Sequence, residues 1–238
     1  MSDQPIPAGP SSRLKWLHRI GYVTTALVLA EILFAGFIFG SEWLRVRAFE
    51  RERIEMTRTR DGPIHADGHV NRLAVRLLSG LPALKSLGDD GFRFVAMPSF
   101  NYTNYAVALY LPRNGEQATG VLILYDVRAD PAETKRRAFI MPKADYARLM
   151  AAIDTLTDGW AGAIDLCTDG TPLGFERVRG SRITSGIGNC SDHYDQLGSL
   201  VFEALRKIVP EDMPDSENWH WREPAGEAPS NAVTMPKP

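Results

Sequence analysis

The spacing of hydrophobic residues changes along the chain, and it begins with one long apolar run. In residues 20–40, Glu31 is the only acidic or basic residue. A helix that rises about 1.5 Å per residue spans about 31 Å over this run, enough to cross a hydrocarbon core of roughly 30 Å. The run is longer than the apolar part of a secretory signal peptide, and no small-residue cleavage site follows it. We therefore predict a transmembrane helix at 20–40, preceded by a disordered basic tail at 1–19.

Two features of this helix exceed what a simple anchor needs. Ala26, Ala30, Gly36 and Gly40 fall within about 120° of one another, and small residues on one face let two helices approach closely. Glu31 lies near the membrane midplane, where a charged carboxylate is costly unless it is protonated or paired. The pattern predicts contact with another transmembrane helix, from a second copy or from a partner subunit. A neutral Glu31 tolerated in a simple anchor is the alternative.

Beyond the apolar run the chain first becomes charged. Residues 41–68 mix arginine with glutamate as far as position 59, and then contain glycine and proline. We interpret this segment as a charged helical stalk followed by a linker. Helical spacing resumes at 69–87, where Pro82 is expected to kink or split the helix.

After Gly88 the hydrophobic residues alternate with period two, which is typical of strands. We expect six or seven strands, at 92–96, 105–111, 120–127, 137–141, 164–168, 173–178 and 181–187. Apolar residues at spacings of three and four predict two further helices, one from Pro142 to Asp158 and one capped by Asp192 that ends at Pro210. Short strands in hairpin-like succession favour an antiparallel sheet with both helices on one face.

The fold class that follows is α+β. It has a single N-terminal transmembrane helix, then a mainly antiparallel sheet of about six or seven strands covered by two or three helices. The globular domain is expected at 69–210. The tail at 211–238 is rich in proline and acidic residues, and it is expected to be disordered because it can bury little apolar surface.

Charge and composition exclude several classes of function. The formal net charge of −2 provides no basic field, so we expect no nucleic-acid partner. The Gly-Ile-Gly sequence at 186–188 is too short for a phosphate-binding loop, and no lysine directly follows it. We therefore expect no cofactor, and the partners that we expect are the lipid bilayer and another transmembrane helix.

Cys167 and Cys190 are the only two cysteines of the chain. The first ends an expected strand and the second precedes the last helix, so we predict a disulfide between them that ties these elements together. Two unpaired buried thiols are one alternative. Another makes Cys190 a nucleophile at a helix N-terminus with His193 as its base, although such pairs usually converge from distant positions. Cys167, Cys190 and His193 lack the sequence spacing that is usual for zinc ligands, and we predict no metal site.

Two other polar segments are candidates for binding. His65, Asp67 and His69 alternate along the stretch before residue 69, where we expect a polar linker rather than a surface metal site. The segment at 100–105 packs three aromatic residues and two asparagines between two strands, a composition typical of adaptable contact surfaces. We predict a binding loop formed by Phe100, Asn101, Tyr102, Asn104 and Tyr105. The alternative is that the rings turn into the core.

The charges that flank the apolar run give conflicting evidence on topology. Three basic residues precede it and six arginines follow it by position 60, which by the positive-inside rule places the C-terminal side in the cytoplasm. Long C-terminal domains cross membranes largely regardless of charge, however, and a disulfide requires an oxidising compartment. We therefore expect a protein of the cytoplasmic membrane whose C-terminal domain lies outside, on the periplasmic side.

No strong catalytic signature is present, and this absence decides the leading hypothesis. We expect a non-enzymatic accessory, assembly or binding subunit of a cell-envelope complex. A membrane-tethered hydrolase that uses Cys190 and His193 is the alternative. A domain that faces the cytoplasm is a third hypothesis, in which the cysteines are free thiols.

Overall fold

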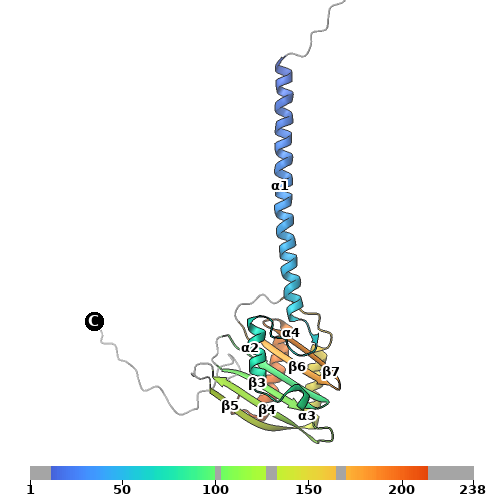
Figure 1. Ribbon diagram of the computed structural model, residues 1–238, viewed down its shortest axis with the longest axis vertical. Coiled ribbons are helices and arrows are strands. Elements are labelled where there is room, and N and C mark those ends of the chain that lie inside the picture. The colour runs from blue at the N-terminus through green and yellow to red at the C-terminus, as the bar shows by residue number, and fades with distance from the viewer. Residues whose placement is uncertain (1–11, 100–102, 127–132, 165–169, 214–238) are drawn as a thin grey trace, which may run out of the picture. The chain divides into compact units, whose positions relative to one another are not determined.

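In the computed structural model the chain divides into two compact units, Met1–Arg51 and Glu52–Pro238. The first unit holds most of one long helix, and the second holds the sheet and the other helices (Figure 1). The structure describes residues 12–99, 103–126, 133–164 and 170–213.

Helix α1 (Ser12–Thr57) is continuous over 46 residues. In the described part of the chain, α1 is the one helix long and apolar enough to cross a membrane. Its most apolar stretch has a mean hydropathy of 2.0. The predicted N-terminal tail is wrong from Ser12 onward, because the helix already begins there. Residues 12–19 contain neither glycine nor proline, and their leucine, lysine and arginine residues favour helix. The charged stretch after residue 40 continues the helix, as its mixture of arginine and glutamate indicates.

The second unit is built on one antiparallel sheet of seven strands, which confirms the α+β prediction. The strands follow the order β1-β7-β6-β2-β3-β4-β5, and every neighbouring pair is antiparallel. Their bounds are β1 (Arg60–Asp61), β2 (Asp90–Ala96), β3 (Thr103–Tyr110), β4 (Gln117–Asp126), β5 (Glu133–Pro142), β6 (Leu173–Arg179) and β7 (Arg182–Gly188).

Helices cover both faces of this sheet (Figure 1). They are α2 (Gly68–Leu78), the short 3-10 helix η1 (Leu84–Leu87), α3 (Lys143–Thr157) and α4 (Asp192–Ile208). As predicted, α3 and α4 share one face, where they pack on Phe92 and Tyr105. Helix α2 packs on the other face, against Val95. The segment predicted as one helix at 69–87 is divided into α2 and η1, with Pro82 between them.

Two cores result from the alternation of side chains along the strands. β2 supplies Phe92 and Phe94 to the core beneath α3 and α4, and Val95 to the core beneath α2. All three side chains are fully buried. Burial of each contributes about 1.5–3 kcal/mol relative to exposure, so both faces of the sheet stabilise the domain.

One edge strand comes from an unexpected segment. β1 lies at residues 60–61, within the predicted linker, and pairs with β7 through Arg60 opposite Ser185. Of the strand predicted at 164–168, only residue 164 is described, and it belongs to no strand. A strand of two residues is too short for alternation to reveal, so the sequence pattern could not indicate β1.

Candidate functional site

Thr57, the last residue of α1, holds the end of this helix on the domain through hydrogen bonds. Thr57 Oγ1 accepts a hydrogen bond from Ala163 N at 3.0 Å and donates one to Ala163 O at 2.8 Å. The hydroxyl of Tyr194 donates to Thr57 O at 2.8 Å. Close by, the amide of Thr59 donates to Trp160 O at 3.0 Å. All these groups belong to the second unit, so the last turn of α1 is part of the folded domain.

Two glycines of β7 make room for Tyr194. A Cβ on Gly186 would lie 2.6 Å from the Tyr194 hydroxyl oxygen, and a Cβ on Gly188 would meet the ring itself. Both distances are shorter than the contacts that Cβ atoms make in proteins. Packing therefore accounts for the Gly-Ile-Gly sequence at 186–188.

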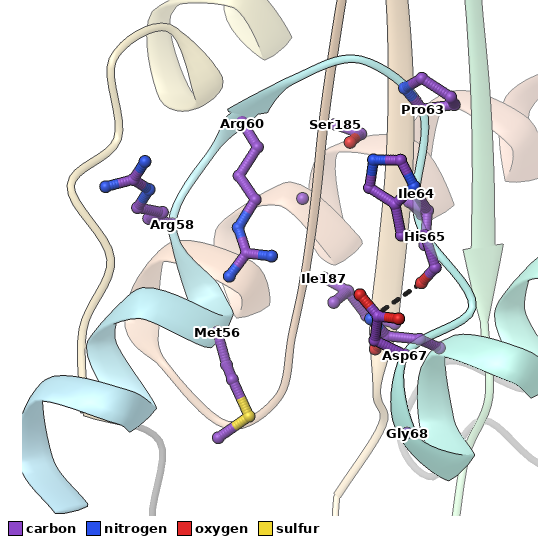
Figure 2. A pocket seen from close by; sticks show the side chains of 12 residues that line it. Met56, Arg58, Arg60, Pro63, Ile64, His65, Asp67, Gly68, Ser185 and Ile187 are labelled. Carbon is purple, nitrogen blue, oxygen red and sulfur yellow. Dashed lines mark hydrogen bonds between the residues drawn. The ribbon is translucent and has the colours of Figure 1, made fainter.

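A pocket of about 290 Å³ opens beside this junction (Figure 2). One wall comes from the end of α1 and from β1, the other from the linker that leads into α2, and residues of β7 lie between them. The lining consists of Met56, Arg58, Arg60, Pro63, Ile64, His65, Asp67, Gly68, Asn71, Ser185, Gly186 and Ile187.

The wall formed by α1 and β1 carries two guanidinium groups. Arg58 Nη1 lies 3.0 Å from Glu55 Oε2, and Arg60 Nη2 lies 3.9 Å from Glu55 Oε1. Arg60 Nη2 also donates to the backbone oxygen of Glu55 at 2.6 Å. Arg60 Nε is buried and has no hydrogen-bond partner among the described residues. One carboxylate thus lies near two guanidinium groups, which leaves this wall with an excess of positive charge.

The wall formed by the linker and α2 is polar but less charged. Asn71 Nδ2 donates to His65 O at 3.2 Å, the dashed line in Figure 2. Asp67 precedes the first residue of α2, yet its side chain accepts no capping hydrogen bond. His69 lies exposed in the first turn of α2 and does not line the pocket. In the described part of the chain no three His, Cys, Asp or Glu side chains form a group that could hold a metal ion.

A buried ion pair on the α2 face of the sheet holds the linker in place. Glu176 Oε2 accepts a hydrogen bond from Arg93 Nε at 2.7 Å, and Glu176 Oε1 accepts one from Ile64 N at 3.1 Å. Arg93 Nη1 donates to Pro82 O at 3.2 Å. The Glu176 side chain is 3 % exposed and that of Arg93 is 11 % exposed. Buried charges of this kind need a partner, so the pair fixes Ile64 as part of the pocket wall.

A second ion-pair network lies on the α3 face of the sheet. Arg177 Nε donates to Asp154 Oδ1 at 2.8 Å, and Arg177 Nη1 donates to Asp90 Oδ1 at 2.5 Å. Burial lowers the pKa of Arg177, but the hydrogen bonds to Asp154 and Asp90 outweigh burial and raise it above the ordinary value. Tyr146 donates to Asp90 O at 3.1 Å, and burial, followed by the charge of Asp90, raises the pKa of its hydroxyl. These groups satisfy one another, which is typical of a structural network.

His193 is held by ring stacking. Its imidazole lies parallel to the Trp160 indole, with ring centroids 3.8 Å apart and planes 4° apart. His193 Nε2 is buried without a hydrogen-bond partner among the described residues. Burial lowers the pKa of His193, which favours the neutral imidazole. The arrangement favours a packing role over that of a base for Cys190.

Cys190 lies exposed at the start of α4, with a positive φ of 48°. The next residue, Ser191, caps this helix through its side chain, in the place predicted for Asp192. Cys167 lies outside the described residues, so the disulfide stays a prediction. Gly170 lies so close to Cys190 that a Cβ on it would meet the Sγ atom. Residue 170 is three positions after Cys167 in the sequence.

The predicted binding loop is divided by the structure. Phe100, Asn101 and Tyr102 lie outside the described residues. Asn104 is 6 % exposed and Tyr105 is fully buried, both within β3. The prediction of a surface loop is wrong for these two residues, because the sheet begins before them and buries both its faces.

The residues predicted to contact another membrane helix lie exposed on α1. They are Glu31, Ala26, Ala30, Gly36 and Gly40. A Cβ on Gly36 or Gly40 would meet nothing within 4 Å in this chain. The helix contact stays a prediction, since its partner is not part of a single chain.

The function of the pocket and of the end of α1 has to be inferred from the residues that form them. Sequence patterns did not single out Arg58 and Arg60, which stand at alternate positions where the charged helix gives way to the linker. Only the end of α1 and the pairing of β1 with β7 bring them to one wall. Comparison of the chain with protein-family models, curated proteins and solved structures gave no match.

Proposed function

We propose that the protein is a single-pass protein of the cytoplasmic membrane and a non-enzymatic accessory, assembly or binding subunit of a cell-envelope complex. The surface of α1 carries this proposal. Its large apolar side chains are exposed, Tyr22 by 76 % and Phe39 by 75 %, and no residue of its most apolar stretch is buried. Apolar surface costs about 25 cal/mol per Å² in water, and a bilayer covers it.

A helical partner is supported by Glu31. This residue lies in the middle of the apolar stretch, and its carboxylate has no hydrogen bond or ion pair among the described residues. A carboxylate in lipid is costly, and a polar contact from a neighbouring helix relieves that cost. The small residues at 26, 30, 36 and 40 allow such a helix to approach closely.

The domain is proposed to lie on the periplasmic side of the membrane. The close approach of Gly170 to Cys190 supports a disulfide with Cys167, because Cys167 is only three positions away from Gly170 in the sequence. Disulfides persist in oxidising compartments such as the periplasm.

The geometry does not favour a membrane-tethered hydrolase. The imidazole of His193 stacks on Trp160, and the carboxylates of the buried Glu176 and the partly exposed Asp154 already bind arginine side chains. A general base must lie within hydrogen-bond distance of the group from which it takes a proton. The side chains of His193, Glu176 and Asp154 are instead engaged in ring stacking or ion pairs.

Replacement of Glu31 by leucine tests the proposal. The full chain would be purified from membranes in mild detergent, and its oligomer size and co-purifying membrane proteins would be compared with those of the unchanged protein. We expect the Glu31→Leu variant to lose its partner or its oligomeric state, since the polar contact between helices is removed.

Val28→Leu is the matched control in the same helix. Val28 lies about 60° or more around the helix from both Glu31 and the small-residue face, and the change keeps the side chain apolar. The control should keep the oligomer size and partners of the unchanged protein. If Glu31→Leu keeps them as well, α1 is only an anchor and the subunit proposal fails.

A further inference from the structure

We propose that the pocket beside β7 binds the C-terminal end of a partner polypeptide, which adds a short strand to the open edge of β7. The inference rests on the proposed function, because it specifies what the binding subunit would take from its partner. Its basis is an unoccupied position in the β1–β7 ladder, together with the two arginines that border this position.

The register of β1 on β7 defines which backbone groups face outward. Arg60 lies opposite Ser185, and Gly62 N donates to Ile183 O at 2.8 Å. In an antiparallel pair, hydrogen-bonded positions recur at every second residue, and the N–H and C=O of one residue point to the same side. Ile183 and Ser185 therefore direct their backbone groups toward β1, and Ile187 directs its groups to the same side.

The partner that this register would give Ile187 is missing. The residue opposite it would be Arg58, but the amide of Arg58 donates to Ile54 O at 3.2 Å, in the last turn of α1. Within the described residues no other backbone hydrogen bond reaches the outward groups of Ile187. One ladder position at the edge of the sheet is thus open, directly beside the pocket that Ile187 lines.

The direction of an added strand determines which end of the peptide meets the arginines. A segment that continues the line of β1 runs antiparallel to β7, so its C-terminal end points toward the start of β1. Arg60 begins β1 and Arg58 lies just before it, and both line the pocket. A terminal carboxylate placed there receives charge-assisted hydrogen bonds from these guanidinium groups.

The remaining lining favours an apolar terminal residue. Met56, Pro63, Ile64 and Ile187 contribute apolar surface to a volume of about 290 Å³, at the lower end of ligand-pocket sizes. Asp67, on the opposite wall, opposes a second negative charge. The ligand class is therefore a peptide with an apolar last residue and a free C-terminal carboxylate, bound by strand addition with carboxylate capture.

The test uses the full chain in detergent and two pools of synthetic peptides with the same randomised sequences. One pool has free C-terminal carboxylates and the other has C-terminal amides. We expect the free-acid pool to bind, with affinities at least about tenfold above those of the amides, because a hydrogen bond to a charged group is lost in the amide. Binding should also slow backbone amide exchange at Ile187. Equal binding of the two pools, or no binding of either, would overturn the proposal.

Variants of the protein locate the interaction. Combined Arg58→Gln and Arg60→Gln substitutions should lower affinity for the selected free-acid peptides at least about tenfold. Arg113→Gln is the matched control, since Arg113 is 90 % exposed and does not line the pocket, and it should leave affinity unchanged. If the double variant fails to fold, the comparison of acid with amide on the unchanged protein decides.

The outcome is independent of the test of the proposed function. Loss of partners in Glu31→Leu reports on the membrane helix, whereas the peptide pools report on the pocket. If neither pool binds while Glu31→Leu still loses its partner, the pocket inference alone fails. If peptides bind but Glu31→Leu changes nothing, the pocket inference stands and the helix contact fails.

Discussion

The hydroxyl of Tyr194, on α4, donates a hydrogen bond of 2.8 Å to the backbone oxygen of Thr57, the last residue of α1. A helix leaves its last carbonyl oxygens without partners, and this bond satisfies one of them inside the domain. Tyr194 is fully buried, so its hydroxyl has no access to bulk water. The bond therefore joins the end of α1 to the packing of α4.

Replacement of Tyr194 by phenylalanine is expected to destabilise the domain by about 0.5–1.5 kcal/mol, since the Thr57 oxygen loses a donor at a buried site. Urea unfolding of the full chain in detergent measures the change. Tyr110→Phe is the matched control, because the half-buried Tyr110 has no hydrogen bond from its hydroxyl among the described residues. Equal losses in the two variants would show that the hydroxyl of Tyr194 contributes nothing specific.

The ion pair of Glu176 with Arg93 should contribute far more. In Glu176→Gln the buried guanidinium of Arg93 loses its counter-charge, and loss of one partner of a buried pair costs about 3–5 kcal/mol. The control is Asp61→Asn, which removes an exposed pair with Arg182 and should cost less than about 1 kcal/mol. Urea unfolding of both variants decides, and a similar small loss in both would mean that the pair does not hold the linker.

Much of the fold could be predicted from the sequence because it follows from local periodicity. Alternation from Phe92 to Ala96 predicts β2, and the spacing of apolar residues predicts α3 and α4. The apolar run that includes Glu31 predicts the long N-terminal helix. In each case the pattern repeats over enough residues to identify one type of element.

The candidate site could not be predicted, because it depends on contacts between distant segments. The alternation of side chains along the strands places Arg93 and Glu176 on the face of the sheet opposite Phe94. Charged residues on one face of a sheet usually indicate that this face is exposed to solvent. That face is instead covered by α2 and the linker, which no local pattern reveals. Arg60 joins the pocket wall only because β1 pairs with β7.

The pH dependence of stability should report the environment of His193. Burial lowers its pKa below the ordinary 6.5, so the unfolded chain binds a proton at a higher pH than the folded chain. The contribution of neutral His193 is fully present above about pH 6.5 and is lost as the pH falls toward the folded pKa. We expect a lower free energy of unfolding at about pH 5.5 than at about pH 7.5.

His193→Phe isolates this effect, because phenylalanine can stack on Trp160 but does not titrate. The variant should show a smaller difference in unfolding free energy between the two pH values. His69→Phe, at an exposed position of α2, should retain the difference of the unchanged protein. An unaltered difference in His193→Phe would assign the pH dependence to other groups.

Labelling of thiols in intact cells tests both the topology and the disulfide. A membrane-impermeant maleimide is applied with and without prior reduction, and lysed, denatured cells give the total number of thiols. We expect labelling in intact cells only after reduction, since a periplasmic disulfide is accessible but blocked. Labelling that needs lysis but no reductant would place the domain in the cytoplasm. In that case the positive-inside count was the better guide.

Replacement of Cys190 by serine distinguishes a structural cysteine from a catalytic one. A disulfide with Cys167 closes a loop whose chain-entropy contribution is about 3 kcal/mol, so the variant should unfold at lower urea concentration by about that free energy. While folded, it should keep the partners and oligomer size of the unchanged protein, because the proposed helix contact does not involve Cys190. Cys167→Ser should cost the same, and the double variant should cost no more than either single change, since one bond is lost in all three. Unequal single losses, or losses that add in the double variant, would mean that the two thiols act separately.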